Sequence, residues 1–172
     1  MEAYRLGIKF FASTGRIDLT EFIPVFHEWI QKQIIEGHLL IDVHNYSHIH
    51  DGPGILLVAH EGNFTIDFTD GRIGFVYYRK QPFNTVADIV KPAVKGCRLL
   101  EEDPRMRGRL KFSTDEVVVF ANDRLIAPNS SETFSQLQPQ LFAVLKETLG
   151  KPFALSQISD DPKERLTIRG QA

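Results

Sequence analysis

The sequence predicts one α+β domain, a mostly antiparallel sheet packed by three helices. Three segments carry apolar residues at the helical steps of three and four, and many shorter segments alternate as strands do. Strong turn signals join those strands as hairpins, which favours α+β over a doubly wound fold. The 172 residues, 42% of them hydrophobic, are sufficient for one core, so we expect a single domain over residues 1–172.

Each of the three expected helices presents one apolar face and contains a proline. Their predicted ranges are Leu19–Ile35, Thr85–Glu101 and Ser131–Leu149. Pro24 falls in the first two turns of its helix, where a missing N–H costs little. Pro92 is expected to kink or split its helix, and Pro139 to bend the third. Gly150 should end the third helix.

The remaining segments are expected to be strands. Their ranges are 4–12, 39–44 with an extension to 50 left open, 54–60, 63–68, 73–80, 109–113, 116–121, 124–127, 153–158 and 165–169. Asp70-Gly71 predicts a tight hairpin, and residues 51–54, Asp-Gly-Pro-Gly, predict another sharp reversal.

A weak internal sequence similarity relates the first and last parts of the chain. Pro24 and Pro139 lie 115 positions apart, each in a helix that a strand should follow. The similarity is compatible with a strand–helix–strand–strand unit present twice, with a third copy around Pro92, and equally with a chance match of apolar periods.

Charge and cysteine content exclude several classes of protein. A net charge of −2 argues against general binding to nucleic acid or acidic membranes, which requires a basic surplus. The basic run from Arg105 to Lys111 follows three acidic residues, so it is either a self-compensating turn or a phosphate-binding patch. The single cysteine, Cys97, excludes an internal disulfide and is expected to be buried. Without a secretion signal or an apolar span, the cytoplasm is the expected location.

One segment concentrates polar side chains that could do chemistry. If residues 41–51 are extended, Asp42, His44, Tyr46, His48 and His50 point to the same side of the strand. Residues at that spacing are about 6.6 Å apart along the backbone, close enough for two imidazoles to share one divalent transition metal. His48 and His50 therefore form a possible metal pair, and His44 could join it through a twist or bulge.

The return strand could bring further groups to the same place. If His50 pairs with Ile55, Glu61 lies opposite His44, and a slip by one residue puts His60 there instead. Glu61 and His60 are thus the candidate catalytic groups of a metal-dependent hydrolase. Two other interpretations stay open: histidines that are merely exposed, and a metal-free polar pocket at the hairpin.

In the pocket interpretation, Asp42, Tyr46 and His48 bind a small ligand, and His48 or His60 acts as a general base. It predicts a concave surface at the Gly-Pro-Gly turn of residues 52–54. No His-Glu-x-x-His motif, nucleophile elbow or dinucleotide fingerprint is present to identify a known chemistry.

Several short motifs in residues 5–80 resemble a group of small uncharacterised bacterial proteins. They are Phe26-His-Glu-Trp-Ile-Gln31, Leu40-Ile-Asp-Val43, Tyr46-Ser-His48, Gly52-Pro-Gly54, His60-Glu-Gly62 and Asp70-Gly-Arg72. The resemblance implies a bacterial, cytosolic protein and carries no mechanism. The first functional hypothesis is a non-catalytic binding or assembly protein, in which a homodimer is one form of partner. The metal-dependent hydrolase and the enzyme with a histidine base are the alternatives.

Overall fold

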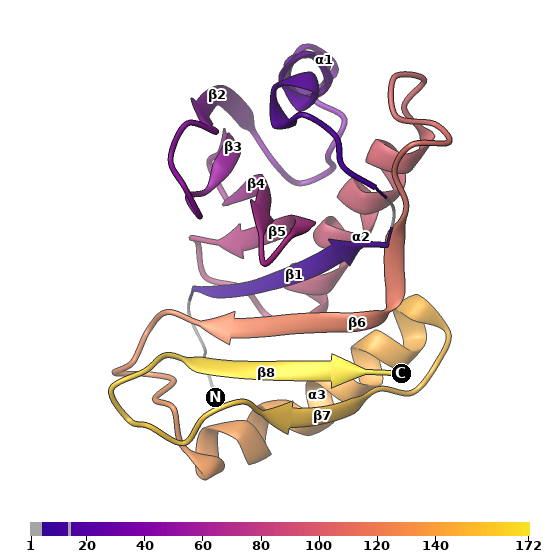
Figure 1. The fold of residues 1–172 in the computed structure, drawn as a ribbon. Helices are drawn as coiled ribbons and strands as arrows, with labels where there is room; N and C mark the ends of the chain where they lie inside the picture. The colour runs from indigo at the N-terminus through magenta and orange to yellow at the C-terminus, as the bar shows by residue number, and fades with distance from the viewer. Residues whose placement is uncertain (1–4, 14) are drawn as a thin grey trace.

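An eight-stranded antiparallel sheet forms the centre of the computed structural model, which describes residues 5–13 and 15–172 (Figure 1). The strands lie side by side in the order β2-β3-β4-β5-β1-β6-β8-β7. Their bounds are β1 Leu6–Ala12, β2 Leu40–Tyr46, β3 Gly54–Ala59, β4 Gly62–Thr69, β5 Arg72–Arg79, β6 Phe112–Ala121, β7 Ala154–Gln157 and β8 Leu166–Gln171. Every neighbouring pair is antiparallel, which confirms the predicted α+β class.

Three α-helices pack on the same face of the sheet. They are α1 Ile23–Lys32, preceded by the 3-10 helix η1 Leu19–Phe22, α2 Ala87–Glu102 and α3 Ser131–Leu149. Trp29 of α1 meets Phe64 edge-on at 6.4 Å, and Gly96 of α2 lies against the ring of Phe75. Figure 1 shows α2 and α3 behind β1, β6 and β8. None of the described helices is long and apolar enough to cross a membrane.

The helices agree with the sequence prediction except at two points. The first expected helix is divided into η1 and α1, and it ends at Lys32 because Gln33 takes a left-handed conformation with φ 47°. Pro24 occupies the first turn of α1, as expected. Pro92 lies inside one continuous α2, so the expected split does not occur. The predicted bounds of α3 are confirmed.

The strand predictions fail mainly around β6. The two strands expected at 109–113 and 116–121 are one strand, and residues 124–127 form a turn. Tyr4, the first residue of the expected strand 4–12, lies outside the described residues.

The order of elements contains the predicted unit twice. The run β1-α1-β2-β3 and the run β6-α3-β7-β8 both follow the order strand, helix, strand, strand. Their first strands, β1 and β6, pair antiparallel in the middle of the sheet. The region around Pro92 is not a third copy, because the strand that follows α2 leads directly into α3.

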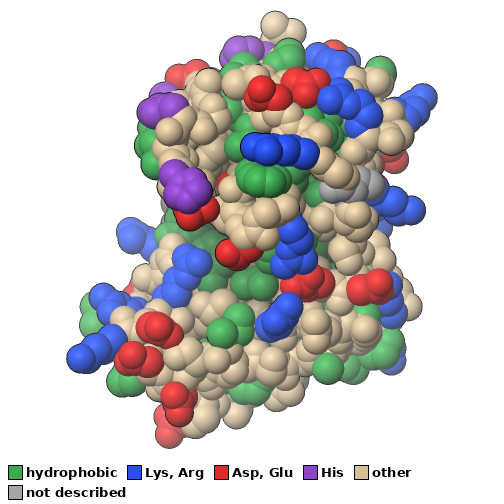
Figure 2. Space-filling view, in the orientation of Figure 1, with side chains coloured by type: hydrophobic (Ala, Val, Ile, Leu, Met, Phe, Trp, Pro, Cys, Tyr) green, Lys and Arg blue, Asp and Glu red, His purple; other side chains and the backbone are tan. Residues whose placement is uncertain are grey.

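The face of the sheet opposite the helices carries apolar and charged side chains in alternation. One row of paired residues crosses all eight strands: His44, Leu56, Thr65, Val76, Lys9, Val118, Arg169 and Ser156. Lys9 Nζ lies 3.0 Å from Asp67 Oδ1 and 2.9 Å from Thr69 Oγ1. Figure 2 shows this face as green apolar areas between red and blue charged groups.

The outer edge of β2 is partly protected against pairing with another strand. The side-chain amide of Gln33 donates to Leu40 O and its oxygen accepts the Leu40 N–H, each at 3.0 Å, as a neighbouring strand would. The carboxylate of Asp42 accepts the N–H of Val43 at 2.8 Å. Such caps are a common way to blunt an exposed strand edge.

Candidate functional site

The turn between β2 and β3 is longer than the sequence predicts. β2 ends at Tyr46, and the Asn45 side chain then accepts the N–H and the hydroxyl of Ser47 at 2.9 and 2.6 Å. This local hydrogen bonding competes with continuation of the strand. Asp51 and Gly54 close the turn with positive φ values of 53° and 70°. The extension of the strand to residue 50 is therefore wrong.

The five polar side chains expected on one strand face are separated into two groups. Asp42, His44 and Tyr46 lie on the face of the sheet opposite the helices, the open face, as the alternation of side chains predicts. Their partners on β3 are Val58 for Asp42, Leu56 for His44 and Gly54 for Tyr46. The rings of His44 and Tyr46 stack at 6.2 Å. His48 and His50 instead lie in the turn and are exposed.

The return strand also pairs in another register than the one expected. Asn45, rather than His50, pairs with Ile55, because the turn uses residues 47–53. His60 and Glu61 consequently lie at the far end of β3, roughly 17 Å from the turn at the usual rise per residue. There Glu61 accepts the N–H of Leu39 with both carboxylate oxygens, at 2.8 and 3.0 Å, and is a positioning group for the chain.

The histidines do not converge on a common point. Among the residues that the structure describes, no three His, Cys, Asp or Glu side chains are placed so that they could hold a metal ion. Two of the histidines lie near a carboxylate of the same segment: His44 Nε2 is 3.7 Å from Asp42, and His50 Nε2 is 3.2 Å from Asp51. Figure 2 shows the histidine side chains spread along one margin of the molecule, on the side of β2 and β3.

A cleft of about 740 Å³ lies against the same turn, where the pocket interpretation expects a concave surface. One wall is the turn and the other is the segment that leads from β1 into η1. Its lining residues are Arg16, Ile17, Asp18, Leu19, Thr20, Ser47, Ile49, His50, Asp51, Gly52, Gly54 and Phe68. Of the predicted site residues only His50 contributes, whereas Asp42, Tyr46, His48 and His60 do not.

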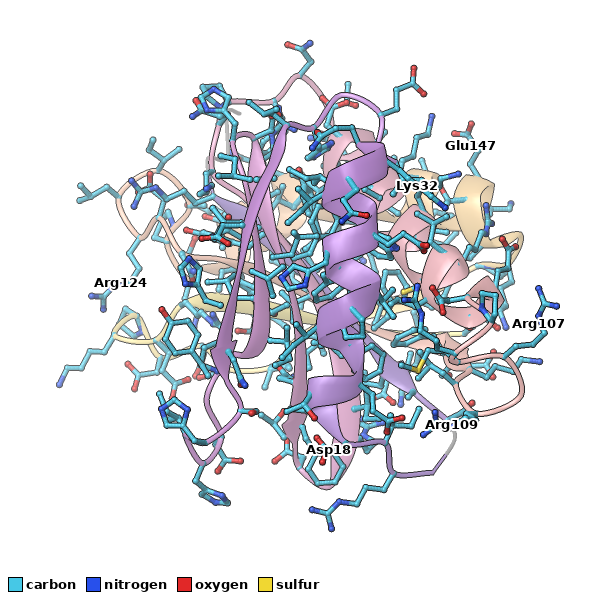
Figure 3. All side chains as sticks on the ribbon, turned by 90° about the horizontal axis from the view of Figure 1, so that it is seen from above. Asp18, Lys32, Arg107, Arg109, Arg124 and Glu147 are labelled. Carbon is cyan, nitrogen blue, oxygen red and sulfur yellow. The ribbon has the colours of Figure 1, made fainter. Side chains whose placement is uncertain are left out.

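The polar groups of the cleft differ in how far they are already engaged. The carboxylate of Asp18 accepts the N–H and the hydroxyl of Thr20 at 2.9 and 2.8 Å, which lowers the pKa of Asp18 below its usual range. Asp18 lies where the chain enters η1, at one end of the helix seen in Figure 3. The Arg16 guanidinium stacks over the ring of Phe68 at 5.1 Å. It forms no hydrogen bond or ion pair with the part of the chain that the structure describes.

The structure also joins two residues that the sequence analysis did not connect. His38 Nε2 lies 2.5 Å from the phenol oxygen of Tyr77, which is fully buried. Burial lowers the pKa of His38 and raises the pKa of Tyr77. A tyrosine at a core position of a strand needs a partner for its hydroxyl, and that requirement is the sequence signal for such a pair.

Two arginines of the basic run pair with carboxylates, one of which lies in the same turn and the others in η1 and α1. Arg105 bonds Asp103 and Glu28, and Arg109 forms a two-bond ion pair with Glu21. These pairs support the self-compensating turn over the phosphate patch.

Cys97 is buried, as predicted, and its pKa is raised well above the ordinary value by burial. Comparison of the chain with protein-family models, with curated proteins and with solved structures finds no match.

Proposed function

We propose that this chain is a cytoplasmic, non-catalytic binding protein whose cleft between η1 and the β2–β3 turn takes a small anionic ligand with an apolar body. The observation that supports it most is Arg16, a cation on the cleft wall that is stacked on Phe68 and forms no hydrogen bond or ion pair with the described residues, although the charge of Asp18 lies nearby. A guanidinium stacked on a ring keeps its N–H groups available for a carboxylate or phosphate.

The size and the walls of the cleft fit such a ligand. A volume of 740 Å³ is in the range of small-molecule sites. Leu19, Ile49 and Phe68 provide apolar surface, whereas the imidazole of His50 already lies 3.2 Å from Asp51. Binding is favoured over catalysis because the two hydroxyls of the cleft, Thr20 and Ser47, already donate to side chains that shape local turns.

Titration with phenyl phosphate and with benzoate tests the proposal and separates the two anion types. We expect one of them to bind and to shift the amide resonances of residues 16–20 and 47–54. Arg16→Gln should weaken that binding about 10- to 100-fold, the usual effect of losing a hydrogen bond to a charged group. Arg165→Gln is the matched control, since Arg165 stacks on Phe120 at 4.1 Å outside the cleft. Equal effects of the two substitutions, or no binding of either probe, would refute the proposal.

Association of two copies through the β2 edge is a second candidate function. Three of the exposed large apolar side chains lie on this strand or next to it, Leu39, Ile41 and Ile49, with 58%, 53% and 48% of their surface exposed. Exposed apolar side chains that lie close together, as Leu39 and Ile41 do at one end of β2, mark interaction surfaces. Because Gln33 caps Leu40, the second copy would cover side chains here rather than extend the sheet along the whole strand.

Light scattering coupled to gel filtration tests this association. We expect a concentration-dependent dimer that Ile41→Lys converts to a monomer. Leu125→Lys is the control, because Leu125 is 95% exposed in the turn after β6, away from this edge. A monomer at every concentration would exclude the association.

A further inference from the structure

A groove between α2 and α3 contains two adjoining hollows. The inner hollow measures about 170 Å³ and reaches the sheet, and the outer one measures about 320 Å³. Val94, Arg98 and Thr148 line both hollows and therefore mark the neck between them. This groove is separate from the cleft at the β2–β3 turn, with which it shares no lining residue.

Five of the ten residues that line the inner hollow are apolar, and the other five are Arg98, Glu101, Ser113, Thr114 and Thr148. Phe10 and Phe112 form its floor, and Val94, Cys97 and Leu149 line it further. The Cys97 thiol is neutral, because burial disfavours the thiolate, so it acts as part of an apolar wall. A cavity of about 150 Å³ can accept a six-carbon ring, so the inner hollow has room for a tail of about six carbon atoms.

The neck contains a polar group without a partner. Among the described residues, the hydroxyl of Thr148 is the one buried side-chain polar atom that has no hydrogen bond. Leaving such a group unpaired costs about 1–3 kcal/mol. A ligand acceptor at the neck would remove this cost after a rotation of the Thr148 side chain.

The outer hollow presents an excess of positive charge. Lys91, Lys95 and Arg98 lie on one side of α2 and make no hydrogen bond or ion pair with any described residue. Two carboxylates share the groove, but one of them, Glu101, already accepts the Phe112 N–H at 2.7 Å. The other, Glu147, belongs to the outer rim of α3, where it is labelled in Figure 3.

We propose that this groove is a second ligand site, which takes a small carboxylate with an apolar tail of about six carbon atoms. The carboxylate lies at the neck, where the Arg98 guanidinium and the Thr148 hydroxyl donate to it and Lys95 adds charge. The tail lies in the inner hollow against Phe10, Phe112 and Cys97.

Calorimetric titration of the intact chain with sodium hexanoate tests this site, with 1-hexanol as the uncharged counterpart. We expect hexanoate to bind more tightly than acetate and than hexanol. Arg98→Gln should weaken hexanoate binding about tenfold or more, and Thr148→Val, which keeps the shape of the side chain, should weaken it less. Lys163→Gln, an exposed lysine outside the groove, should have no effect.

The single cysteine supplies a second readout, since hexanoate should slow the reaction of Cys97 with a thiol reagent. Arg16→Gln must leave the protection of Cys97 by hexanoate unchanged, which distinguishes this site from the cleft at the β2–β3 turn. The proposal is overturned if millimolar hexanoate does not bind, if hexanol binds equally well, if Arg98→Gln has no effect, or if the Cys97 rate is unaltered.

Discussion

His38 and Tyr77, 39 positions apart in the chain, share a hydrogen bond of 2.5 Å between the imidazole Nε2 and the phenol oxygen. The other ring nitrogen, Nδ1, lies 3.0 Å from the carbonyl oxygen of Glu36. A carbonyl can only accept, so Nδ1 carries the proton and Nε2 accepts from Tyr77. Arg79 donates to the same phenol oxygen at 3.4 Å. The buried hydroxyl therefore has two side-chain partners, His38 as its acceptor and Arg79 as a donor to it.

Loss of the His38 side chain and loss of the Tyr77 hydroxyl should change the free energy of unfolding by different amounts. His38→Ala leaves the buried Tyr77 hydroxyl without its acceptor and should cost about 1–3 kcal/mol in the free energy of unfolding. Tyr77→Phe in the His38→Ala background should be neutral or stabilising, because it removes the unpaired group. Urea denaturation of both single variants and the double variant measures the coupling. Tyr46→Phe is the control, and additive effects at His38 and Tyr77 would contradict the assignment.

The same pair should make stability depend on pH in two ranges. The pKa of His38 is lowered, chiefly by burial, so below about pH 6.5 the unfolded chain binds more protons at this site than the native state does. Stability should therefore fall as the pH drops from 6.5 towards the native pKa. The pKa of Tyr77 is raised by burial, so stability should also fall as the pH rises above about 10.

Denaturation curves of the native sequence and of His38→Gln between pH 4.5 and 8 measure the first range. The difference between the two should shrink on acidification. His60→Gln, the same substitution at an exposed histidine, is the matched control. A constant difference at all pH values would show that His38 titrates normally.

The parts of the fold that were predicted correctly are those with local signals. The Ser130 hydroxyl accepts the N–H of Thr133, and Gly150 ends α3 in a left-handed conformation with φ 76°. Both ends of α3 are therefore encoded within a few residues of it. The predicted register between β2 and β3 was wrong because the register depends on the number of residues in the turn. The hydrogen bonds of the Asn45 side chain to Ser47 fix where that turn begins.

Contacts across the sheet explain the other errors. Thr114 and Asp115 interrupt the apolar pattern of β6, which made one strand look like two. In the structure the next residue, Glu116, pairs with Arg169 of the neighbouring β8 at 3.0 Å and with Arg72 of β5, two strands away, at 2.7 Å. Arg16 could not be predicted as a site residue either, because Phe68, the ring on which it stacks, is 52 positions away in the chain.

Removal of one partner of the ion pair between Lys9 and Asp67 on the open face should lower stability, whereas replacement of both partners by apolar residues should change it little. Asp67 is 7% exposed, and burial raises its pKa despite the neighbouring lysine. Gly74 leaves room for the pair, since a Cβ there would lie 2.2 Å from Lys9 Cε. Lys9→Met leaves the buried Asp67 carboxyl group without its partner and should lower the free energy of unfolding by about 3 kcal/mol. Lys9→Met combined with Asp67→Leu should leave it nearly unchanged. Chemical denaturation at pH 7 compares them, and a double variant as unstable as Lys9→Met would show that the pair stabilises the fold.

Gly54, at the start of β3 and on the wall of the proposed ligand cleft, should tolerate no side chain. Its φ of 70° disfavours any L residue, and a Cβ would lie 2.1 Å from the carbonyl oxygen of Ile66. Gly37 is the matched control, because its φ is 73° and a Cβ there would meet nothing within 4 Å. Gly37→Ala should cost only the left-handed strain of about 1–2 kcal/mol. Gly54→Ala should cost clearly more in urea denaturation, since β3 must also move away from β4; equal losses would mean that the backbone absorbs the clash.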